Sequence, residues 1–401
     1  MTDLYRFQDE AVEYHLNHHY TLNCSEMGLG KSRMAILAAK KSGLKVAVFG
    51  PEFLRQTWVN EGRSAGVEFD YFAYSKVHHR LPLSGYGFWI ADEVHYLKTP
   101  TARRTHSFYS YLKTHRPEYF VGLSGTPIKN RLPDFWTLLA FCSLNPKDTN
   151  GLRLEGDNTK YFSFCRKFCM RQVVSVRGCR IEKFGGIKPF MIDEFKGLLE
   201  KKYIRFTAEK VLQQLPAMTR KDVFLDMEPV PELAEQFERY MEGSKADTSA
   251  KSASAALKAR LTAKYALNLL EDGAESLVIF SDHREPTKII SEAIPGAVAI
   301  TGATPSKRRA EYVEKFQKGK IKVLVATIGS MAVGVTLHRS RNIIFNDLSW
   351  VPADNLQAEK RIHRIGQEYP CVSHTIISSP TDSYINKTLF EKMKSIEEVV
   401  K

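Results

Sequence analysis

The sequence has little of what marks secreted, membrane-spanning or fibrous proteins. Its six cysteines in 401 residues are too sparse for a disulfide framework, which fits a reducing compartment. No apolar run approaches the roughly 20 residues that cross a bilayer, and the start, MTDLYRFQDE, lacks the basic and then apolar segments of a signal peptide. We therefore expect a protein that has no membrane partner and stays in the compartment where it is made.

Zinc ligands are also scarce. Cys165, Cys169 and Cys179 lie close together, but no fourth ligand follows at zinc-finger spacing, and cysteine is a common buried residue. We expect no zinc site. Hydrophobic residues at 43% and charged residues at 26% are ordinary for globular proteins, and the length suits two or three domains.

Acidic residues are fewer than basic residues. Lys and Arg number 58 against 45 Asp and Glu, which leaves a net charge of +13 that attracts polyanions. Residues 160–188 alone carry eight bases and one acid, interleaved with phenylalanines. We interpret this span as an auxiliary DNA surface through Arg171, Arg177 and Arg180, with an aromatic ring stacking on an unpaired base or wedging a junction. The alternative is a solvated basic face over a small aromatic core.

Short apolar runs alternate with helical stretches at both ends of the chain. In the first 130 residues, TLNCSE, KVAVFGP, GFWIADE and YFVGLSG predict strands, and residues 31–42 predict a helix that Gly43 ends. From residue 277, LVIFSDH, AVAITG, KVLVATI, NIIFNDL and VSHTIIS predict strands, with helices through Ile294, over residues 305–317 and through Arg364. Runs without polar alternation indicate strands covered on both faces. The pattern predicts an α/β fold with two lobes, each a parallel sheet flanked by helices.

The middle of the chain has a different pattern. Residues 131–240 lack this alternation and look mainly helical, with long mixed stretches such as DEFKGLLEKKYIRFTAEKVLQQL. The stretch GSKADTSAKSASAA is small and polar and predicts either a mobile connection or a frayed helix. We therefore divide the chain into lobe 1, residues 1–145, a mainly helical insertion with a linker, residues 146–256, and lobe 2, residues 257–401.

The segment SEMGLGKS follows a predicted strand and opens a predicted helix, as a phosphate-binding loop does. Gly28 and Gly30 allow a tight turn that aims N–H groups at phosphate oxygens. Lys31 reaches the β- and γ-phosphates, and Ser32 offers its hydroxyl to magnesium. The segment begins with Ser where a phosphate loop usually has Gly. The alternative is a purely structural role, in which a glycine-rich turn caps the helix.

The segment WIADEVH places Asp92 and Glu93 at the carboxyl end of a predicted strand, where α/β sheets bind ligands. Asp92 would hold Mg²⁺ through its water shell, and Glu93 would orient and deprotonate the attacking water. The alternative is that both acids cap the next turn. The segment LSGTP closes a further strand with a hydroxyl-rich turn and is a weak signal by itself.

The segment QAEKRIHRIGQ, residues 357–367, falls on a predicted helix. Arg361 and Arg364 are three residues apart, so both should project from one face. Guanidinium groups at that spacing suit the charge that develops on a γ-phosphoryl group during transfer. The alternative is a solvated basic helix face.

In this order the segments resemble the motifs of superfamily-two helicases, and more closely those of Swi/Snf-type double-stranded DNA translocases. LYRFQ resembles the Q motif, SEMGLGKS motif I, GPEFLRQTWVNE motif Ia, DEVH motif II and LSGTPIKNRLPDFWTLLAFCSLNP an extended motif III. SMAVGVTL resembles motif V, and LSWVPADNLQAEKRIHRIGQ resembles motif VI. The spacing FGG…IRF…VLQQLP and the segment ITGATPSKRRAEYVEKFQ are most similar to the HepA-related annealing-helicase branch.

This resemblance implies two RecA-like lobes that use ATP and Mg²⁺ and bind DNA, duplex or branched, without regard to sequence. Beyond the residues named above, it implies nucleotide contacts from Gln8, Met27, Leu29, Gly334 and Gln357. It implies DNA contacts, mainly to phosphates, from Pro51, Ser75, Asn130, Thr304, Gly334, Thr336 and Trp350. Proteins bound to that DNA are the further partners that it suggests.

The chain departs from the family pattern at several positions. Ser25 stands where Asp is usual, Val94 where Ala, Lys129 where Gln, Phe206 where a second Arg, and Val351 where Asn. None of these is a hydrolytic group, so we expect ATPase activity to survive. The length leaves no room for accessory modules, so we expect a compact bacterial or phage-like motor. We expect it in the cytoplasm, associated with the nucleoid or in a phage host, or in the nucleus if the source is eukaryotic.

These observations predict an ATP-dependent translocase on double-stranded or branched DNA that remodels forks or displaces bound proteins. Hydrolysis would be coupled to closure of the two lobes. Two alternatives stay open. One is a strand-separating DNA or RNA helicase, and the other is a nucleotide-gated DNA-binding adaptor with little turnover.

Overall fold

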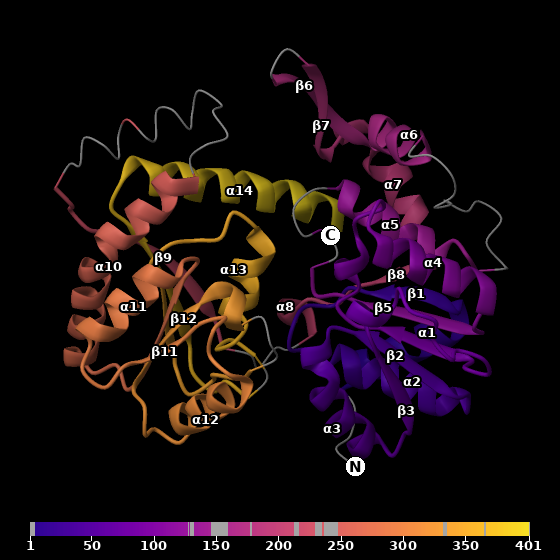
Figure 1. Ribbon diagram of the computed structural model, residues 1–401, viewed down its shortest axis with the longest axis horizontal. Coiled ribbons are helices and arrows are strands. Elements are labelled where there is room, and N and C mark those ends of the chain that lie inside the picture. Colours follow the sequence, from indigo (N-terminus) through magenta and orange to yellow (C-terminus); the bar gives the residue numbers. More distant parts are fainter. Residues whose placement is uncertain are drawn as a thin grey trace. The chain divides into compact units, whose positions relative to one another are not determined.

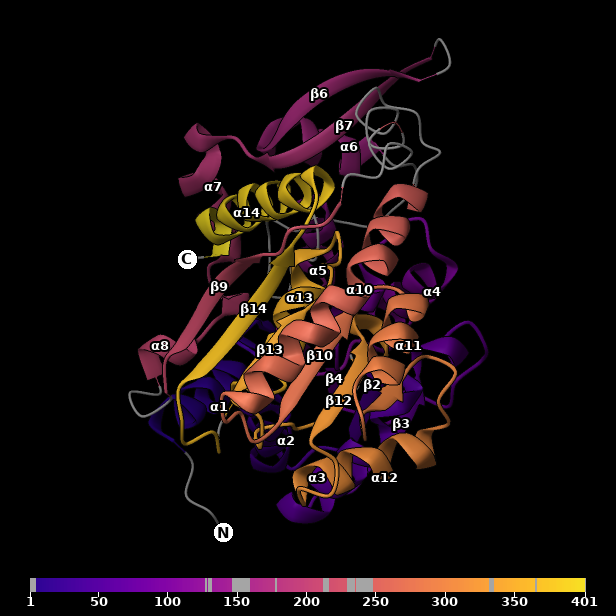
Figure 2. The same ribbon diagram turned by 90° about the vertical axis from the view of Figure 1, so that its left-hand side faces the viewer.

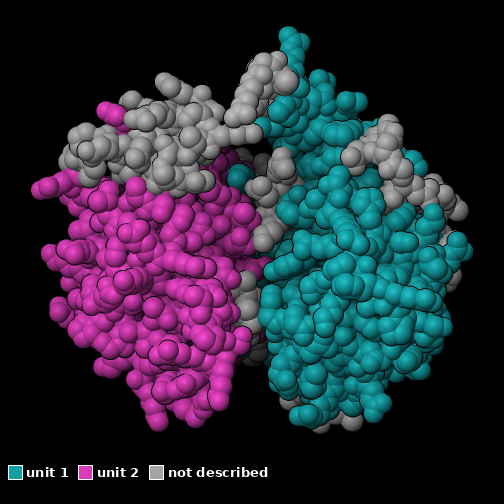
Figure 3. All heavy atoms as spheres, viewed as in Figure 1, with its two compact units in different colours: residues 1–213, 392–401 teal, residues 214–391 magenta. Residues whose placement is uncertain are grey.

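The computed structural model divides the chain into two compact units (Figure 1). It describes residues 5–126, 128, 132–145, 159–176, 179–211, 216–228, 235, 248–331, 335–364 and 366–400. Unit 1 comprises residues 1–213 and 392–401, and unit 2 comprises residues 214–391 (Figure 3). Each unit is built on its own parallel sheet flanked by helices, which confirms the predicted α/β fold with two lobes.

The sheet of unit 1 has the strand order β3-β2-β4-β5-β1-β8, with every pair parallel. Its strands are β1 (Tyr20–Asn23), β2 (Val46–Gly50), β3 (Phe69–Ala73), β4 (Phe88–Ala91), β5 (Tyr119–Leu123) and β8 (Tyr203–Ile204). β1, β2 and β4 are buried along their whole length, as expected for strands with both faces covered. The four runs that we predict as strands in this half are therefore confirmed.

The helices of unit 1 pack around an aromatic core. They are α1 (Arg6–His18), α2 (Lys31–Ser42), α3 (Arg55–Ala65), α4 (Arg103–His115), α5 (Pro133–Cys142), α6 (Thr159–Phe168), α7 (Ile192–Leu199) and α8 (Ala208–Val211). Phe49, Trp89, Phe108 and Phe141 are fully buried and in ring contact. α2 begins and ends at the predicted residues. It ends there because Gly43, at φ 69°, adopts the left-handed conformation that ends a helix.

The middle of the chain is less helical than the sequence pattern suggests. β6 (Cys169–Val176) and β7 (Cys179–Ile187) form an antiparallel ribbon. The long mixed stretch that we read as helical is broken, since Tyr203–Ile204 leaves the helix to pair with β1 at the edge of the sheet. The stretch 243–256 is helical from Thr248 onward.

The sheet of unit 2 has the order β11-β12-β10-β13-β14-β9, again with every pair parallel (Figure 2). Its strands are β9 (Met218–Phe224), β10 (Leu277–Ser281), β11 (Val298–Ile300), β12 (Val323–Thr327), β13 (Asn342–Phe345) and β14 (Cys371–Ile377). The helices are α10 (Thr248–Glu271), α11 (Arg284–Ala293), α12 (Ser306–Gln317), α13 (Pro352–Glu359) and α14 (Pro380–Val400), whose last residues belong to unit 1. β9 was not predicted, because its exposed edge position leaves most of its residues polar.

The predicted helix through Arg364 is wrong in its last turn. α13 ends at Glu359, and residues 360–364 follow as turns. Ile362 is fully buried there, and the backbone carbonyl of Arg361 accepts a hydrogen bond from the N–H of Leu337. This tertiary contact directs the chain away from helix. Among the described residues, none of the helices has the length and apolar character that a membrane crossing requires.

Candidate nucleotide site

The loop before α2 has the backbone geometry of a phosphate-binding loop. Gly28 and Gly30 have φ angles of 85° and 81°, which glycine adopts without strain. A Cβ on Gly30 would lie 2.6 Å from Nε2 of Gln8, so a side chain here would displace Gln8 as well as strain the backbone. Lys31 opens α2 and donates from Nζ to the carbonyls of Ser25 at 2.9 Å and Glu26 at 3.0 Å. Its ammonium therefore lies over the loop.

A distant segment of the chain supports this loop. The N–H groups of Cys24 and Glu26 donate to the carbonyls of Ile204 and Phe206 at 2.8 and 2.9 Å. The hydroxyl of Ser25 accepts the N–H of Phe206 at 3.2 Å. Ser25 and Phe206, two of the positions at which the chain departs from the family pattern, are therefore in contact. A serine hydroxyl suits this hydrogen bond because its partner is a backbone N–H and not a charged side chain.

Asp92 and Glu93 follow β4 directly, and their environments differ. Nε1 of Trp58 donates to one oxygen of Asp92 at 2.8 Å, and the N–H of Glu93 donates to the other at 2.8 Å. Burial and the neighbouring charge of Glu93 nevertheless raise the pKa of Asp92 to about 7. Burial lowers the pKa of the Lys31 ammonium, and the carboxylates of Glu93 and Asp92 act against that shift. The lysine and both acids thus interact.

This donor set suits a metal–nucleotide complex. The raised pKa of Asp92 reflects buried negative charge that a divalent cation would offset. Ser32 lies in the first turn of α2, next to Lys31, where a hydroxyl can join a metal's ligands. Asp92, Glu93 and Ser32 therefore fit magnesium chemically, and Lys31 with the start of α2 fits the phosphates.

His95 is a site residue that the sequence analysis missed. Its Nδ1 lies 3.3 Å from Oε2 of Glu93 and 3.0 Å from Oγ of Ser124. Ser124 also accepts the N–H of Thr126 at 3.2 Å. Contacts therefore run from the predicted general base to the turn after β5. The signal was present as the histidine of DEVH and the serine of LSGTP, but only the fold brings these two together.

The Q-motif glutamine closes the other end of the loop. Nε2 of Gln8 donates to the carbonyl of Leu29 at 3.1 Å, and its Oε1 accepts the N–H of Tyr5 at 3.2 Å. Phe7 stacks against Tyr5, with ring centroids 5.7 Å apart, and its ring centroid lies 5.5 Å from that of Phe206. These rings were not predicted as site residues, because aromatic residues in a sequence more often indicate core.

The predicted residues of unit 2 lie on α13 and in the turns that follow it. Nη1 of Arg364 donates to the hydroxyl of Thr336 at 2.9 Å, and burial lowers the pKa of this guanidinium. The carbonyl of Arg361 accepts the N–H of Leu337 at 2.8 Å. Gln357, at the end of α13, is 7% exposed. The two arginines are therefore placed by turns, whereas Gln357 lies on α13 itself.

Two known protein families match parts of this chain. The description "SNF2-related domain" matches residues 71–271, which is half of the chain, and "Helicase conserved C-terminal domain" matches residues 261–366.

The chain belongs to the SNF2-related family.

Two relatives agree with this family. The chain is 25% identical to "SWI/SNF-related matrix-associated actin-dependent regulator of chromatin subfamily A-like protein 1" of Drosophila melanogaster, over 94% of this chain and 52% of the relative. It is 25% identical to "DNA annealing helicase and endonuclease ZRANB3" of Mus musculus, over 95% of this chain and 39% of the relative. The chain thus spans about half of these relatives or less. The Swi/Snf-type resemblance is confirmed, and the second relative fits the annealing-helicase branch.

Solved structures give a more distant likeness. The "Sulfolobus solfataricus SWI2/SNF2 ATPase core in complex with dsDNA" is 19% identical, covers 100% of this chain and 93% of its own, and superposes with a TM-score of 0.43.

The DNA contacts expected of an SNF2-related chain are scattered over both units. Pro51 follows β2, and Ser75 lies in the short turn after β3. The hydroxyl of Thr304 accepts the N–H of Thr301 at 3.0 Å, and the ring of Trp350 lies 6.5 Å from that of Tyr384. Outside the described residues lie Asn130, Arg177 and Gly334.

The basic span of this SNF2-related chain combines exposed arginines with buried phenylalanines. Arg171 and Arg180 are both exposed, and Arg171 also forms an ion pair with Glu182 at 2.8 Å. Phe164 and Phe168 are each 4% exposed and belong to the core of unit 1, so they are not free to stack on a base. The predicted aromatic role is wrong for these two residues. Both are buried because α6 uses them to pack against Phe195 of α7.

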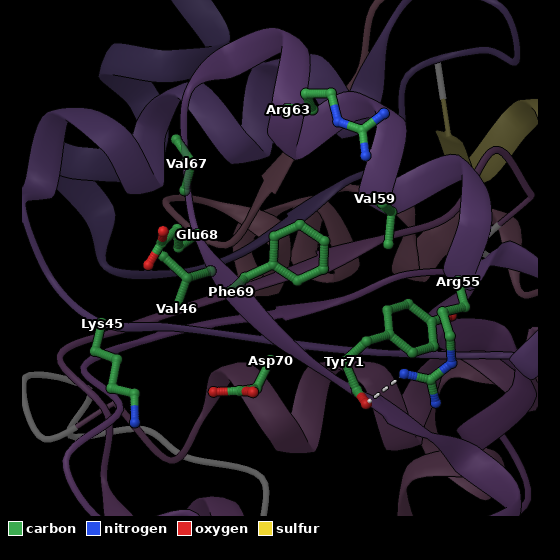
Figure 4. A pocket seen from close by; sticks show the side chains of 10 residues that line it. All are labelled: Lys45, Val46, Arg55, Val59, Arg63, Val67, Glu68, Phe69, Asp70 and Tyr71. Carbon is green, nitrogen blue, oxygen red and sulfur yellow. Dashed lines mark hydrogen bonds between the residues drawn. The ribbon is translucent and has the colours of Figure 1, made fainter.

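Two further features involve none of the predicted nucleotide residues. A groove of about 640 Å³ runs between α3 and the edge strand β3, lined by Arg55, Arg63, Phe69 and Tyr71 among others (Figure 4).

In unit 2, Asp282, His283 and Asp347 are near enough to one another to share a metal. Asp282 is already paired with Lys251 at 2.5 Å, and Asp347 accepts hydrogen bonds from Ser281, Asn346 and the N–H of Asp282. Protein groups therefore pair with both aspartates, whereas Nε2 of His283 is buried 3.9 Å from Asp347 without a hydrogen bond among the described residues.

Proposed function

We propose that this chain is a DNA-dependent ATPase that moves along double-stranded or branched DNA, remodelling forks or displacing bound proteins. The observation that carries the proposal is the joint environment of Lys31, Asp92 and Glu93, whose charges interact at the start of α2 and the end of β4. The family of the chain and the names of its relatives support the substrate class.

The roles of the chain's own groups follow from their positions. Lys31 and the start of α2 would bind the terminal phosphates, and Asp92 with Ser32 would hold the cation. Magnesium, when bound, neutralises developing charge on the phosphates. Glu93 accepts the proton of the attacking water, and His95 orients its carboxylate from 3.3 Å. Gln8, which donates a hydrogen bond to the carbonyl of Leu29, binds the base of the nucleotide.

The second half of the proposal concerns unit 2. Arg361 and Arg364, with Gln357, stabilise charge on the transferred phosphoryl group. Because Arg364 also donates to Thr336, a residue expected to contact DNA, this hydrogen bond links the phosphate-sensing arginine to the DNA grip. Cycles of nucleotide binding and hydrolysis then alternate the affinity of the two units for the strand, which produces movement.

Phosphate release with and without DNA tests this proposal. We expect hydrolysis to rise many-fold with duplex, forked or four-way DNA and to rise less with RNA, and we expect higher salt to weaken the effect. A triplex-displacement assay run beside a strand-displacement assay separates translocation from unwinding. Displaced triplex with intact duplex supports translocation, whereas separated strands support the helicase alternative. Hydrolysis that is absent with every nucleic acid would instead support the adaptor.

A further inference from the structure

The ribbon formed by β6 and β7 has an anchored base and a free outer part. At its base, Cys169, Phe184 and Ile187 are buried in the core of unit 1, and the N–H of Lys188 donates to the carbonyl of Phe168 at 2.8 Å. Beyond this base the ribbon extends past α6 and α7, away from the sheet of unit 1 (Figures 1 and 2). We call residues 170–173 and 180–183 the outer ribbon.

The outer ribbon exposes apolar side chains on both faces. Val173 lies opposite Glu182 in the antiparallel register, so these two share one face, and Ile181 points to the other. Val173 is 49% exposed, Ile181 43% and Met170 48%. A two-stranded ribbon without a covered face is at best marginally stable in water. The exposed apolar groups of this element are therefore available to a partner that would cover them.

The charge of the outer ribbon indicates which partner. Its one acid, Glu182, is already paired with Arg171 at 2.8 Å and with Arg166 at 3.3 Å. Arg180 and Lys183 are exposed, and neither forms an ion pair with any residue that the structure describes. Unbalanced positive charge beside apolar side chains suits a ligand that carries both phosphates and flat apolar surfaces. Nucleic acid with unpaired bases has both.

We propose that the outer ribbon recognises branch points in DNA. Val173 and Ile181 pack against unpaired or unstacked bases at the junction, and Arg180 and Lys183 contact the flanking phosphates. A two-stranded ribbon has the right width for the major groove, which is about 12 Å across. Inserting apolar groups requires unstacking, and this costs least where bases are already unpaired. The ribbon therefore gives forked and four-way DNA an advantage over plain duplex.

This inference rests on the proposed DNA translocase and names the DNA that it prefers. The test is the double variant Val173→Ser and Ile181→Ser, which leaves the charge unchanged. Fluorescence anisotropy at one salt concentration compares a fork with a duplex of equal length. We expect fork binding to weaken about tenfold while duplex binding and duplex-stimulated hydrolysis are unchanged. 2-Aminopurine placed at the branch point should change its fluorescence with the wild type and not with the variant.

Two controls separate this effect from others. Val59→Ser makes the same chemical change at a residue of α3 that is 37% exposed, and it should leave the fork preference intact. Arg180→Ala with Lys183→Ala should weaken fork binding and reduce its salt dependence. Thermal unfolding of each variant should match the wild type, because all four ribbon side chains are exposed.

The outcomes distinguish the two proposals. A double variant that keeps the wild-type ratio of fork to duplex affinity overturns the ribbon proposal and leaves a protein-docking surface in its place. Wild-type protein that prefers forks but hydrolyses no ATP overturns the proposed motor and leaves the ribbon proposal standing. Wild-type protein that binds fork and duplex equally overturns the ribbon proposal alone, provided that duplex stimulates hydrolysis.

Discussion

At the residue scale, two adjacent carboxylates are distinguished by their partners. Asp92 is held by Trp58 and by the backbone of its neighbour, whereas Glu93 adopts a left-handed backbone at φ 47° and points to His95. A non-glycine residue in this conformation costs free energy that the surrounding structure must offset, and such residues cluster at functional sites. The different geometries suit the different tasks that we propose for them, cation binding for Asp92 and proton transfer for Glu93.

Glu93→Gln should separate nucleotide binding from hydrolysis. The amide keeps the size of the side chain and loses the base, so we expect ATP to bind normally and turnover to fall at least about 100-fold. Equilibrium binding of a fluorescent ATP analogue and single-turnover phosphate release measure the two effects. The control Glu13→Gln changes an exposed acid of α1 that pairs with Lys41, and it should alter neither. Normal turnover in Glu93→Gln would show that the base lies elsewhere.

Asp92 predicts a dependence of metal–nucleotide binding on pH. Its pKa in the folded protein is about 7, raised from an ordinary value of 3.8, so the carboxyl is largely protonated below pH 7 and ionised above it. Since only the ionised form attracts Mg²⁺, affinity for Mg²⁺–ADP should increase from pH 6 to pH 8. Binding near pH 7 should release protons, which calorimetry in buffers of different ionisation enthalpy detects. We expect Asp92→Asn to abolish this dependence, and a flat profile in the wild type would contradict the assignment.

At the scale of elements, β8 and the residues after it support the phosphate loop from almost two hundred residues downstream. Backbone hydrogen bonds join Leu22, Cys24 and Glu26 to Lys202, Ile204 and Phe206. This support explains why a two-residue strand, too short to be noticed as a pattern, is part of the candidate nucleotide site. It also explains how Ser25 can replace the usual acid, because its partner is a main-chain N–H.

Ser25→Ala should therefore destabilise unit 1 and loosen the loop. The variant leaves the N–H of Phe206 without its acceptor near a fully buried position, which costs about 1–3 kcal/mol. We expect a lower free energy of unfolding in urea and weaker ADP binding. Ser64→Ala, an exposed position on α3, is the matched control and should change neither. Unchanged binding and stability in Ser25→Ala would show that the β8 segment does not support the loop.

At the scale of the whole molecule, hydrolysis is proposed to need groups from both units. Arg364→Ala removes a cation of unit 2 while the phosphate loop of unit 1 stays intact. We expect ATP affinity to change little and hydrolysis to fall about 1,000-fold, the effect typical of an arginine that stabilises a phosphoryl transition state. Phosphate release and equilibrium nucleotide binding measure these effects.

The matched control for Arg364→Ala is Arg260→Ala, an exposed arginine of α10, which should hydrolyse ATP normally. Full hydrolysis in Arg364→Ala would mean that unit 1 completes the reaction alone. In that case the translocation mechanism proposed for the two units would fail.

The sequence by itself determined the features that depend on neighbouring residues. Apolar runs predicted the buried strands, Gly43 predicted the end of α2, and Gly28, Gly30 and Lys31 predicted the phosphate loop, because these signals act within a few residues of chain. The resemblance to Swi/Snf-type motifs extended this to the family.

Tertiary structure alone decided what depends on distant contacts. The short strand β8 forms because β1 offers an open edge, and α13 ends at Glu359 because Arg361 bonds to Leu337 and Ile362 is buried. Phe164 and Phe168 are withdrawn into the core, whereas Val173 and Ile181 are left exposed on the ribbon. Hydrophobicity shows that a side chain is stabilised by burial, but only the packing of all the elements decides which side chains find a place inside.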